Sequence, residues 1–215
     1  CGTTWLQQMV HSLRTGGDLD FDDISRVVPW IETAADLGLD LDAAQRAEPR
    51  AFKSHLSYDQ VPARARYIVS VRDPRDALVS AYRFFEGWFF EPGSIDIETL
   101  GRMRFVEGRT YYTHLVSWWL HRHDANVLLL AYEHMKDDHE GAVRRVAEFI
   151  GFGSDDERIA IACQESSLAS MKAHHDKYDD LMMRERSEVV CDLPSGSDSS
   201  KVRAGHVGAH RAELS

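Results

Sequence analysis

A short apolar run, residues 66–71, is followed at once by a charged turn and a helical pattern, and this succession most constrains the fold. The run is rich in β-branched side chains, which predicts a buried strand. Residues 72–76 carry four charges around a proline, and Leu78, Tyr82 and Phe85 then recur at helical spacing. A strand, a turn and a helix in this order form the βα unit of a parallel sheet.

The same alternation continues along the chain. Helices are predicted at residues 3–13, 77–85, 111–122, 137–150, 155–163 and 166–173, strands at 50–56, 66–71 and 127–132, and weaker helical character at 37–47. Together these predict one doubly wound α/β domain over residues 1–215, a central parallel sheet flanked by helices as in P-loop nucleotide hydrolases. Such a fold binds its ligand at the carboxyl ends of the strands.

Composition excludes several functions. A formal net charge of −10 argues against general nucleic-acid binding, which needs a basic face. No apolar run approaches the roughly 20 residues of a membrane span. The three cysteines are few and odd in number, which favours a reducing compartment and predicts a cytoplasmic protein. Residues 191–200 are rich in Pro, Gly, Ser and Asp, so a mobile loop is expected there.

The start of the first predicted helix has the features of an anion site. Gly2 permits a tight turn, and Thr3 and Thr4 place hydroxyls where a helix leaves its first N–H groups unpaired. The complete phosphate-loop pattern G-x-x-x-x-G-K-[ST] is absent, so an ordinary capped amphipathic helix remains the alternative at this point.

Polar side chains follow the predicted strands. Lys53 and His55 come after one strand, Arg72 after the next and Tyr132 after the third. An arginine at such a place can contact a phosphate with two nitrogens, and Ser80, two turns into the following helix, could add a hydroxyl. The alternative for residues 72–76 is a salt-bridged turn.

Six motifs taken together resemble the cytosolic-type sulfotransferases, which use 3′-phosphoadenosine 5′-phosphosulfate (PAPS). Residues 1–5 resemble the family's Lys-Ser-Gly-Thr-Thr-Trp loop, and residues 52–56 its Lys-Thr-His-Leu strand. Residues 72–80 resemble its 3′-phosphate motif, 132–136 its Tyr-Glu-Asp-Met-Lys, 166–172 its Thr-Ser-Phe-Lys-Glu-Met-Lys, and 203–208 its Arg-Lys-Gly-x-x-Gly. The matches keep the family's order over nearly the whole chain, which is typical of a bacterial-type member or a fragment of one.

The resemblance implies roles. The turn at Gly2, Thr3 and Thr4 would hold the 5′-phosphosulfate, and Trp5 would stack on adenine. His55 would be the general base, for which a near-neutral pKa is suitable, and Lys53 would neutralise charge on the transferring sulfonate. The 3′-phosphate would be held by Arg72, Ser80 and Arg203. The remaining nucleotide contacts would be Tyr132, Ser166, Leu168, Met171, Ala204 and Gly205. Sulfonate transfer requires no metal, and none is predicted.

The acceptor is predicted to be a small, partly apolar phenol, alcohol or glycolipid that offers a hydroxyl or an amine. An aromatic loop at residues 86–93, with Phe89, and the helix at 111–122, with His114, suggest an apolar pocket. A partly buried histidine without a ligand is the alternative for His114. Residues 27–32 could cover such a pocket or simply pack in the core.

The chain departs from the family pattern at several positions, and these departures leave other functions open. The family has a lysine before the residue that matches Cys1, and a strand that leads into the loop. We therefore expect a fragment, which also lacks a C-terminal tail. A homodimer is left open as the assembly. Leu168 stands where the family has an aromatic residue, and Ala204 stands where it has a lysine. Residues 209–211 read Ala-His-Arg where Asp-Trp-Lys is common. These replacements are expected to weaken nucleotide binding. A PAPS-binding module without transfer activity, or a P-loop small-molecule kinase, are the competing hypotheses. The kinase is ranked last because no acidic residue follows a strand beside the loop.

Overall fold

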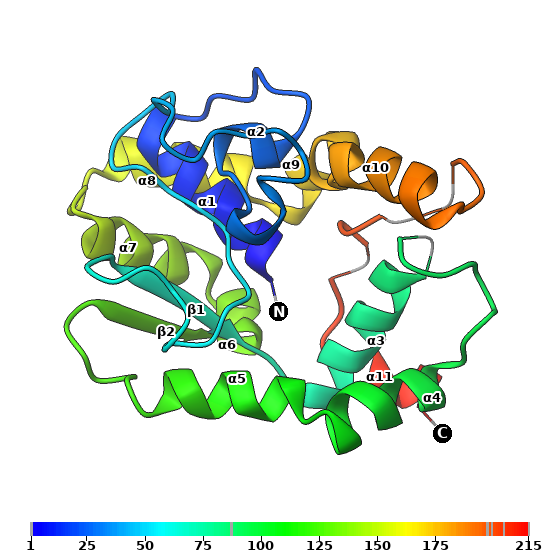
Figure 1. The fold of residues 1–215 in the computed structure, drawn as a ribbon. Coiled ribbons are helices and arrows are strands. Elements are labelled where there is room, and N and C mark those ends of the chain that lie inside the picture. Colours follow the sequence, from blue (N-terminus) through cyan, green and yellow to red (C-terminus); the bar gives the residue numbers. More distant parts are fainter. Residues whose placement is uncertain (1, 87, 197, 199, 204, 215) are drawn as a thin grey trace.

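The computed structural model describes residues 2–86, 88–196, 198, 200–203 and 205–214, and Figure 1 shows their fold. Two strands, β1 (Tyr67–Val71) and β2 (Val127–Ala131), pair in parallel and in register, from Tyr67 opposite Val127 to Val71 opposite Ala131. The two apolar runs that the sequence marks as buried strands therefore form the sheet.

Helices cover both faces of this sheet (Figure 1). One face carries α1 (Thr3–Thr15), α7 (His139–Ile150) and α8 (Asp156–Glu165), and the other carries α5 (Thr110–Trp119). Successive side chains of a strand point to opposite faces. Ile68 accordingly packs against the cluster around α1, whereas Val69 packs with Trp118 of α5.

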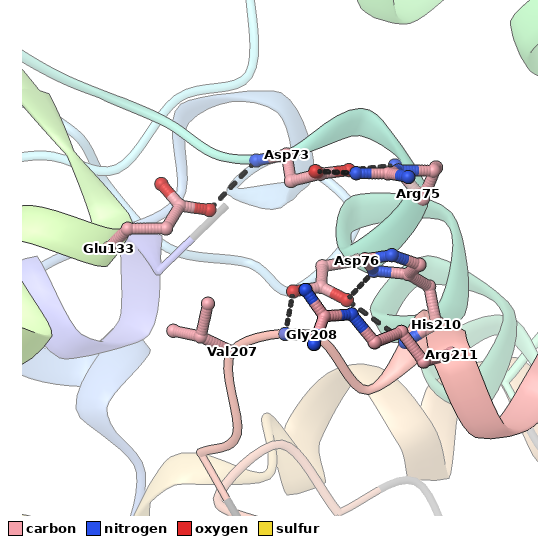
Figure 2. A pocket seen from close by; sticks show the side chains of 8 residues that line it. All are labelled: Asp73, Arg75, Asp76, Glu133, Val207, Gly208, His210 and Arg211. Atoms are coloured by element: carbon pink, nitrogen blue, oxygen red, sulfur yellow. Dashed lines mark hydrogen bonds and ion pairs between the residues drawn. The ribbon is translucent and has the colours of Figure 1, made fainter.

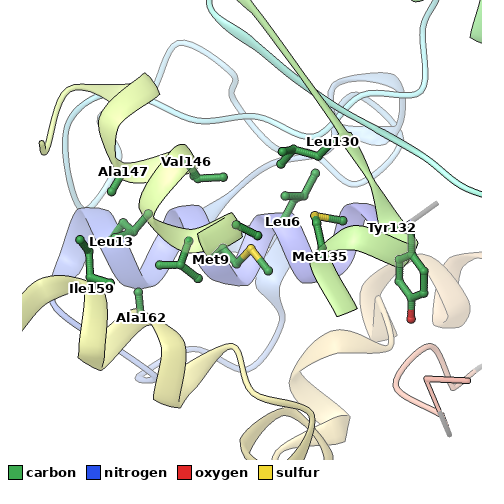
Figure 3. Packing of buried hydrophobic residues seen from close by; sticks show 12 residues of the cluster. Leu6, Met9, Leu13, Leu130, Tyr132, Met135, Val146, Ala147, Ile159 and Ala162 are labelled. Carbon is green, nitrogen blue, oxygen red and sulfur yellow. The ribbon is translucent and has the colours of Figure 1, made fainter. Parts of the chain in front are cut away.

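The larger core lies between α1, α7, α8 and β2 (Figure 3). α1 contributes Leu6, Met9 and Leu13, which lie on one face because they recur at helical spacing. Their partners include Leu130, Met135, Val143, Val146, Ile159 and Ala162. Full burial of an aliphatic side chain contributes roughly 1.5–3 kcal/mol, so this core holds the start of α1 at the edge of the sheet.

The charged turn after β1 begins α3 (Pro74–Phe85), three residues earlier than the sequence predicts. The Asp73 side chain caps the helix by accepting a hydrogen bond from the Arg75 backbone N–H at 2.8 Å. Pro74 occupies the first turn, where a missing N–H costs nothing. This cap places Arg72 at the point where strand ends and helix begins.

The other elements are short. They are α2 (Ile24–Val27), the 3₁₀ helices η1 (Ile31–Thr33) and η3 (His175–Tyr178), α4 (Ile97–Gly101), the π-helical η2 (Arg102–Glu107), α6 (Tyr132–Asp137), α9 (Leu168–Ala173), α10 (Leu181–Cys191) and α11 (His210–Glu213). The predicted helices at 111–122, 137–150, 155–163 and 166–173 correspond to α5, α7, α8 and α9. Cys191 ends α10, residues 197 and 199 lie outside the described residues, and the mobility of 191–200 stays a prediction.

The predicted strand at residues 50–56 is wrong. Only one parallel bridge forms there, between Trp30 and Lys53. Side chains take the backbone N–H groups that a neighbouring strand would need: Gln45 accepts from Ala51 at 2.9 Å, and Glu32 accepts from His55 at 2.5 Å. A ladder cannot extend past these two positions.

Two smaller predictions also need correction. Residues 37–47 form turns instead of a helix, because Gly38 has a left-handed φ of 66° and the Asp40 side chain accepts from the Asp42 N–H at 2.9 Å. Tyr132, predicted at the end of a strand, is the first residue of α6. Within the described residues, no helix has the length and apolar character that crossing a bilayer demands.

Candidate active site

The start of α1 lies against the start of α6. Gly2 has a φ of 76°, and a Cβ at this position would lie 2.9 Å from the Tyr132 ring, so a larger residue would be both strained and crowded. No side chain caps α1 in the part of the chain that the structure describes. The first N–H groups of a helix have no intrahelical acceptor, so the turn at Thr3 and Thr4 is open to an anion.

Trp5 is held at the same place by a distant part of the chain. Its indole N–H donates to the Ser166 carbonyl at 2.7 Å, and its ring meets Tyr132 edge-on at 5.7 Å. Ser166 itself is buried, and its hydroxyl donates to the Ala162 carbonyl at 2.6 Å. Ser166 therefore positions Trp5 through its carbonyl, while its own hydroxyl is used inside the protein.

Arg72 joins β1, α6 and the C-terminal segment, by which we mean residues 200–203 and 205–211. Its guanidinium lies 4.3 Å from the centre of the Tyr132 ring, and its Nη2 donates to the His206 carbonyl at 3.1 Å. The Tyr111 hydroxyl donates to the Arg72 carbonyl. The Nε atom of Arg72 is buried and has no hydrogen-bond partner among the described residues. A buried donor without an acceptor is the feature expected beside an anion site.

The other two predicted 3′-phosphate residues are less clearly placed. Ser80 is exposed on α3. Arg203 donates from Nε to the Ser200 carbonyl at 2.7 Å and from Nη2 to the Arg83 carbonyl at 3.4 Å. It also lies 3.6 Å from Asp198. The nitrogens of Arg203 thus contact protein acceptors, in contrast to the Nε of Arg72.

The late glycine motif lies against α9. A Cβ on Gly205 would lie 3.4 Å from a methyl group of Leu168 and 3.6 Å from the Lys136 ammonium. Met171, predicted to contact the nucleotide, is buried in a core cluster with Phe21 and Tyr178. Cys1 and Ala204, both part of the predicted motifs, lie outside the described residues.

A second group of residues surrounds the buried carboxylate of Asp180. The Lys53 ammonium lies 3.1 Å from Asp180 Oδ2, and Lys201 makes an ion pair with the same oxygen. The other oxygen accepts a hydrogen bond from the Ser25 hydroxyl at 2.7 Å. Burial lowers the pKa of Lys53 to about 8, and the nearby charges of Asp23 and Glu32 oppose this effect only in part. Burial and the charge of Lys53 together lower the pKa of Lys201 well below its usual value.

Three aromatic rings enclose these ammonium groups. Lys201 Nζ lies 4.8 Å from the Phe84 ring, 5.2 Å from Trp88 and 5.9 Å from Trp30. Trp88 is fully buried, whereas the neighbouring Phe89 is 47% exposed. The aromatic loop predicted to receive an acceptor therefore packs partly around a lysine, and Phe89 keeps its ring toward solvent.

His55 lies beside this group. Its ring meets Trp30 edge-on at 5.1 Å. The residue is exposed to solvent, yet the protein atoms packed around the ring, and then the charge of Lys53, lower its pKa well below the usual value. His55 is therefore neutral at pH 7 and able to take a proton. His114, half-buried on α5, also has a pKa lowered by burial.

The predicted residues thus form two groups. The first is connected through direct contacts from Gly2 to Tyr132, from Tyr132 to Trp5 and Arg72, and from Leu168 to Gly205. The second holds Lys53 and His55 around Trp30. The C-terminal segment links them, because Lys201 reaches the second group and His206 the first.

A pocket of about 310 Å³ lies next to the first group (Figure 2). It is lined by Asp73, Arg75, Asp76, Glu133, Val207, Gly208, His210 and Arg211. None of the site residues predicted from the sequence lines this pocket. Within the described residues, no cluster of three His, Cys, Asp or Glu side chains could hold a metal ion.

Sequence reasoning missed several of the residues around Lys53. Asp180 gives no signal, because its lysine partners are 127 and 21 positions away. Lys201 lies two positions before Arg203 but outside the motif that contains Arg203. For Trp30 the sequence permits two interpretations, covering a pocket or packing in the core. In the structure, its ring contacts both Lys53 and His55.

Comparison with known proteins decides the family. The model of the sulfotransferase domain family matches residues 1–215. The chain belongs to the sulfotransferase family. Among curated relatives, sulfotransferase 2A1 of Rattus norvegicus is 32% identical over 197 residues, covering 85% of this chain and 67% of that protein. Sulfotransferase 1C2 of Homo sapiens is 27% identical over 222 residues, covering 96% of this chain and 72% of that protein.

Solved structures show the same fold. Retinol dehydratase, in complex with androsterone and the inactive cofactor PAP, matches this sulfotransferase with a TM-score of 0.73 at 22% identity, covering 100% of this chain and 73% of that one. Mouse sulfotransferase SULT7A1, complexed with PAP, matches with a TM-score of 0.69 at 23% identity, covering 100% and 74%. These comparisons confirm the predicted α/β fold, the family and the enzyme class, a PAPS-dependent sulfotransferase, and they decide against a P-loop kinase.

Proposed function

We propose that this sulfotransferase moves the sulfonate group of PAPS to the hydroxyl of a small, partly apolar acceptor in the cytoplasm. The observation that carries the proposal is the unpartnered, buried Nε of Arg72 beside the uncapped start of α1, the two being joined through the Tyr132 ring. The Nε of Arg72 suits a 3′-phosphate, and the N–H groups at the start of α1 suit a 5′-phosphosulfate. The PAP held by the related structures supports this choice of nucleotide.

The residues present fit such a nucleotide. The N–H groups at Thr3 and Thr4 would bind the 5′ end of the nucleotide. The ring of Trp5, whose orientation is fixed by its hydrogen bond to the Ser166 carbonyl, would stack on adenine. Arg72 would bind the 3′-phosphate through Nε while Nη2 stays on the His206 carbonyl. When bound, PAPS supplies an activated sulfonate whose leaving group is a phosphate.

His55 would act as the base. It takes the hydroxyl proton of the acceptor while the acceptor oxygen bonds to sulfur and the electron pair of the broken sulfur–oxygen bond leaves with the 5′-phosphate. A neutral imidazole is needed for this step, and its lowered pKa keeps the ring neutral at pH 7. The ammonium of Lys53, held by Asp180, would add positive potential at the transferring group.

The acceptor is proposed from two side chains, Phe89 and His114. The exposed ring of Phe89 and the half-buried His114, whose charge acts on His55, suit an apolar body that carries one polar group. Androsterone and retinol, named in the neighbouring structures of retinol dehydratase, are apolar alcohols of this kind. A hydroxyl is favoured over an amine because a protonated amine would meet the charges of Lys53 and Lys201.

The test is transfer of labelled sulfonate from PAPS to a panel of phenols, sterols, retinoids and amines. His55→Ala is expected to lower the rate by about 10²–10⁴-fold, the usual contribution of a positioned base. Its affinity for PAP, measured by calorimetry, should stay within about twofold, because His55 lies in the other group of residues. His123→Ala, an exposed histidine beyond α5, is the matched control and should retain full activity. Full activity of His55→Ala would overturn the role of this residue.

A nucleotide-binding module without transfer activity is the second candidate. It is favoured by one observation, since the ammonium of Lys53 is buried on Asp180 inside the protein. This candidate predicts that the wild-type chain binds PAP but transfers no sulfonate to any member of the panel. Measurable transfer to one acceptor rejects it.

A further inference from the structure

The carboxylate of Asp76 is a second buried anion that no sequence motif singles out. It lies in the first turn of α3 with 1% of the residue exposed (Figure 2). Oδ2 accepts from the Gly208 N–H at 2.6 Å, and Oδ1 accepts from the His210 N–H at 3.0 Å and contacts His210 Nδ1 at 2.7 Å. Burial would raise the pKa of Asp76, but these N–H groups hold it below its usual value, so the carboxylate stays ionised.

These contacts connect α3 to the C-terminal segment just after the residue that Arg72 contacts. Arg72 precedes α3 by two residues, and its Nη2 donates to the carbonyl of His206. Gly208 and His210, both held by Asp76, follow His206 within four residues. The segment that fixes Nη2 of Arg72 is therefore itself fixed by Asp76.

We propose that Asp76 is a positioning residue for the 3′-phosphate: by holding Gly208 and His210 it keeps the His206 carbonyl on Arg72, which leaves the Nε of Arg72 in place as a donor. This inference rests on the proposed nucleotide. A guanidinium restrained before binding loses less conformational freedom when the phosphate arrives, so the restraint increases affinity.

The sign of the effect distinguishes this proposal from simple electrostatics. Asp76 is a negative charge near Arg72, close enough to interact with it. Coulomb's law alone predicts that Asp76→Asn, which removes this charge, strengthens phosphate binding. Positioning predicts the opposite, because the amide of asparagine presents an N–H group to donors that need an acceptor.

The experiment compares two nucleotides by calorimetry, PAP and adenosine 5′-monophosphate, which lacks the 3′-phosphate. With the full chain, Asp76→Asn is expected to weaken PAP binding by about tenfold, as loss of charge-assisted hydrogen bonds implies, and to change AMP binding by less than about twofold. Asp156→Asn is the matched control. It removes a carboxylate from the first turn of another helix, α8, where its partner Arg144 is exposed, so PAP binding should stay unchanged.

A second pair of variants protects the test against misfolding of Asp76→Asn. His210→Ala removes one of the three contacts and should weaken PAP binding by about two- to fivefold, and His210→Asn, whose side-chain N–H can donate to Asp76, should restore much of it. Thermal melts establish that each variant is folded. Equal losses for PAP and AMP, or unchanged PAP binding in folded variants, would overturn the proposal. Failure of the wild-type chain to bind PAP would instead overturn the proposed function.

Discussion

Among the buried aspartates that hold the C-terminal segment, Asp76 and Asp180 do so by different means. Asp76 accepts from two backbone N–H groups and one imidazole, whereas Asp180 faces two ammonium groups and one hydroxyl. Backbone donors are neutral and lie in fixed positions, so they stabilise the charge of Asp76 without another full charge being buried. Around Asp180 the charges of Lys53 and Lys201 are buried with it, and each depends on the carboxylate for its stability.

Their surroundings also differ. Asp76 lies at the edge of an open pocket lined by charged side chains (Figure 2). Asp180 and its lysines lie against Trp30, Phe84 and Trp88, where little water can enter. An effective low dielectric strengthens an ion pair but also raises the cost of leaving one partner alone. The comparison therefore predicts unequal consequences when each carboxylate is removed.

The largest effect is expected for Asp180→Asn. Asn tolerates the left-handed backbone of this residue, φ 49°, so the substitution removes charge without adding backbone strain. It leaves the buried ammonium groups unpaired, which typically costs about 3–5 kcal/mol, against about 1–3 kcal/mol for Asp76→Asn. Urea unfolding at pH 7 measures both, with the exposed Asp192→Asn, which also has a left-handed φ of 53°, as the control. Equal losses at the two aspartates would refute the contrast.

The next effect concerns pH: stability rises with pH in both regions, but in different pH ranges. Lys53 has a folded pKa of about 8, below its usual 10.5, so the unfolded chain binds more protons between these values and stability rises with pH across this window. The gain is roughly 3 kcal/mol at most. Asp76 has a lowered pKa, so its contribution is present above its unfolded pKa and is lost as pH falls through the folded value.

Unfolding curves measured across pH test this difference in pH range. The gap between the wild type and Lys53→Met should change between pH 8 and pH 10.5, and the gap between the wild type and Asp76→Asn should change only at acidic pH. If both gaps change in the same pH range, the two carboxylates do not differ in the way proposed.

The smallest effect is expected for Ser25→Ala. The hydroxyl of Ser25 donates to Asp180 Oδ1, and loss of one such hydrogen bond costs about 1–3 kcal/mol when the acceptor is charged. We expect a value near the lower end, since the two ammonium groups remain. Urea unfolding is the measurement, and Ser57→Ala, at a loop position, is the comparison variant. A loss as large as that of Asp180→Asn would show that the hydroxyl, not the ammonium groups, stabilises the carboxylate.

The parts of the fold that sequence predicts are those set by local patterns. β1, α1 and the body of α3 follow from β-branched residues and helical spacing, which act within a few residues. The cap at Asp73, which begins α3 three residues earlier, was not predicted. Residues 50–56 carry a similar strand pattern, but Glu32 and Gln45 take their N–H groups, and neither can be paired with them from sequence alone. The family could be predicted because short motifs recur in a fixed order.

The site was predicted only where a motif names the residue. Arg72, Tyr132 and Trp5 meet as the motifs suggest, because each follows or begins an element at one end of the sheet. Lys53 was predicted to neutralise charge on the transferring sulfonate, and the structure pairs it with Asp180, 127 residues later. Contacts of this range depend on how the C-terminal third packs, which no local pattern encodes.

The two anchors of the C-terminal segment affect how anything bound beneath it could leave. A strand of chain tied at Lys201 and again at His210 cannot rotate about a single hinge, because both ties would have to break together. It can only arch in the middle, near Gly205. Departure from between Leu168 and Arg72 would then be sideways, or would wait for one tie to open.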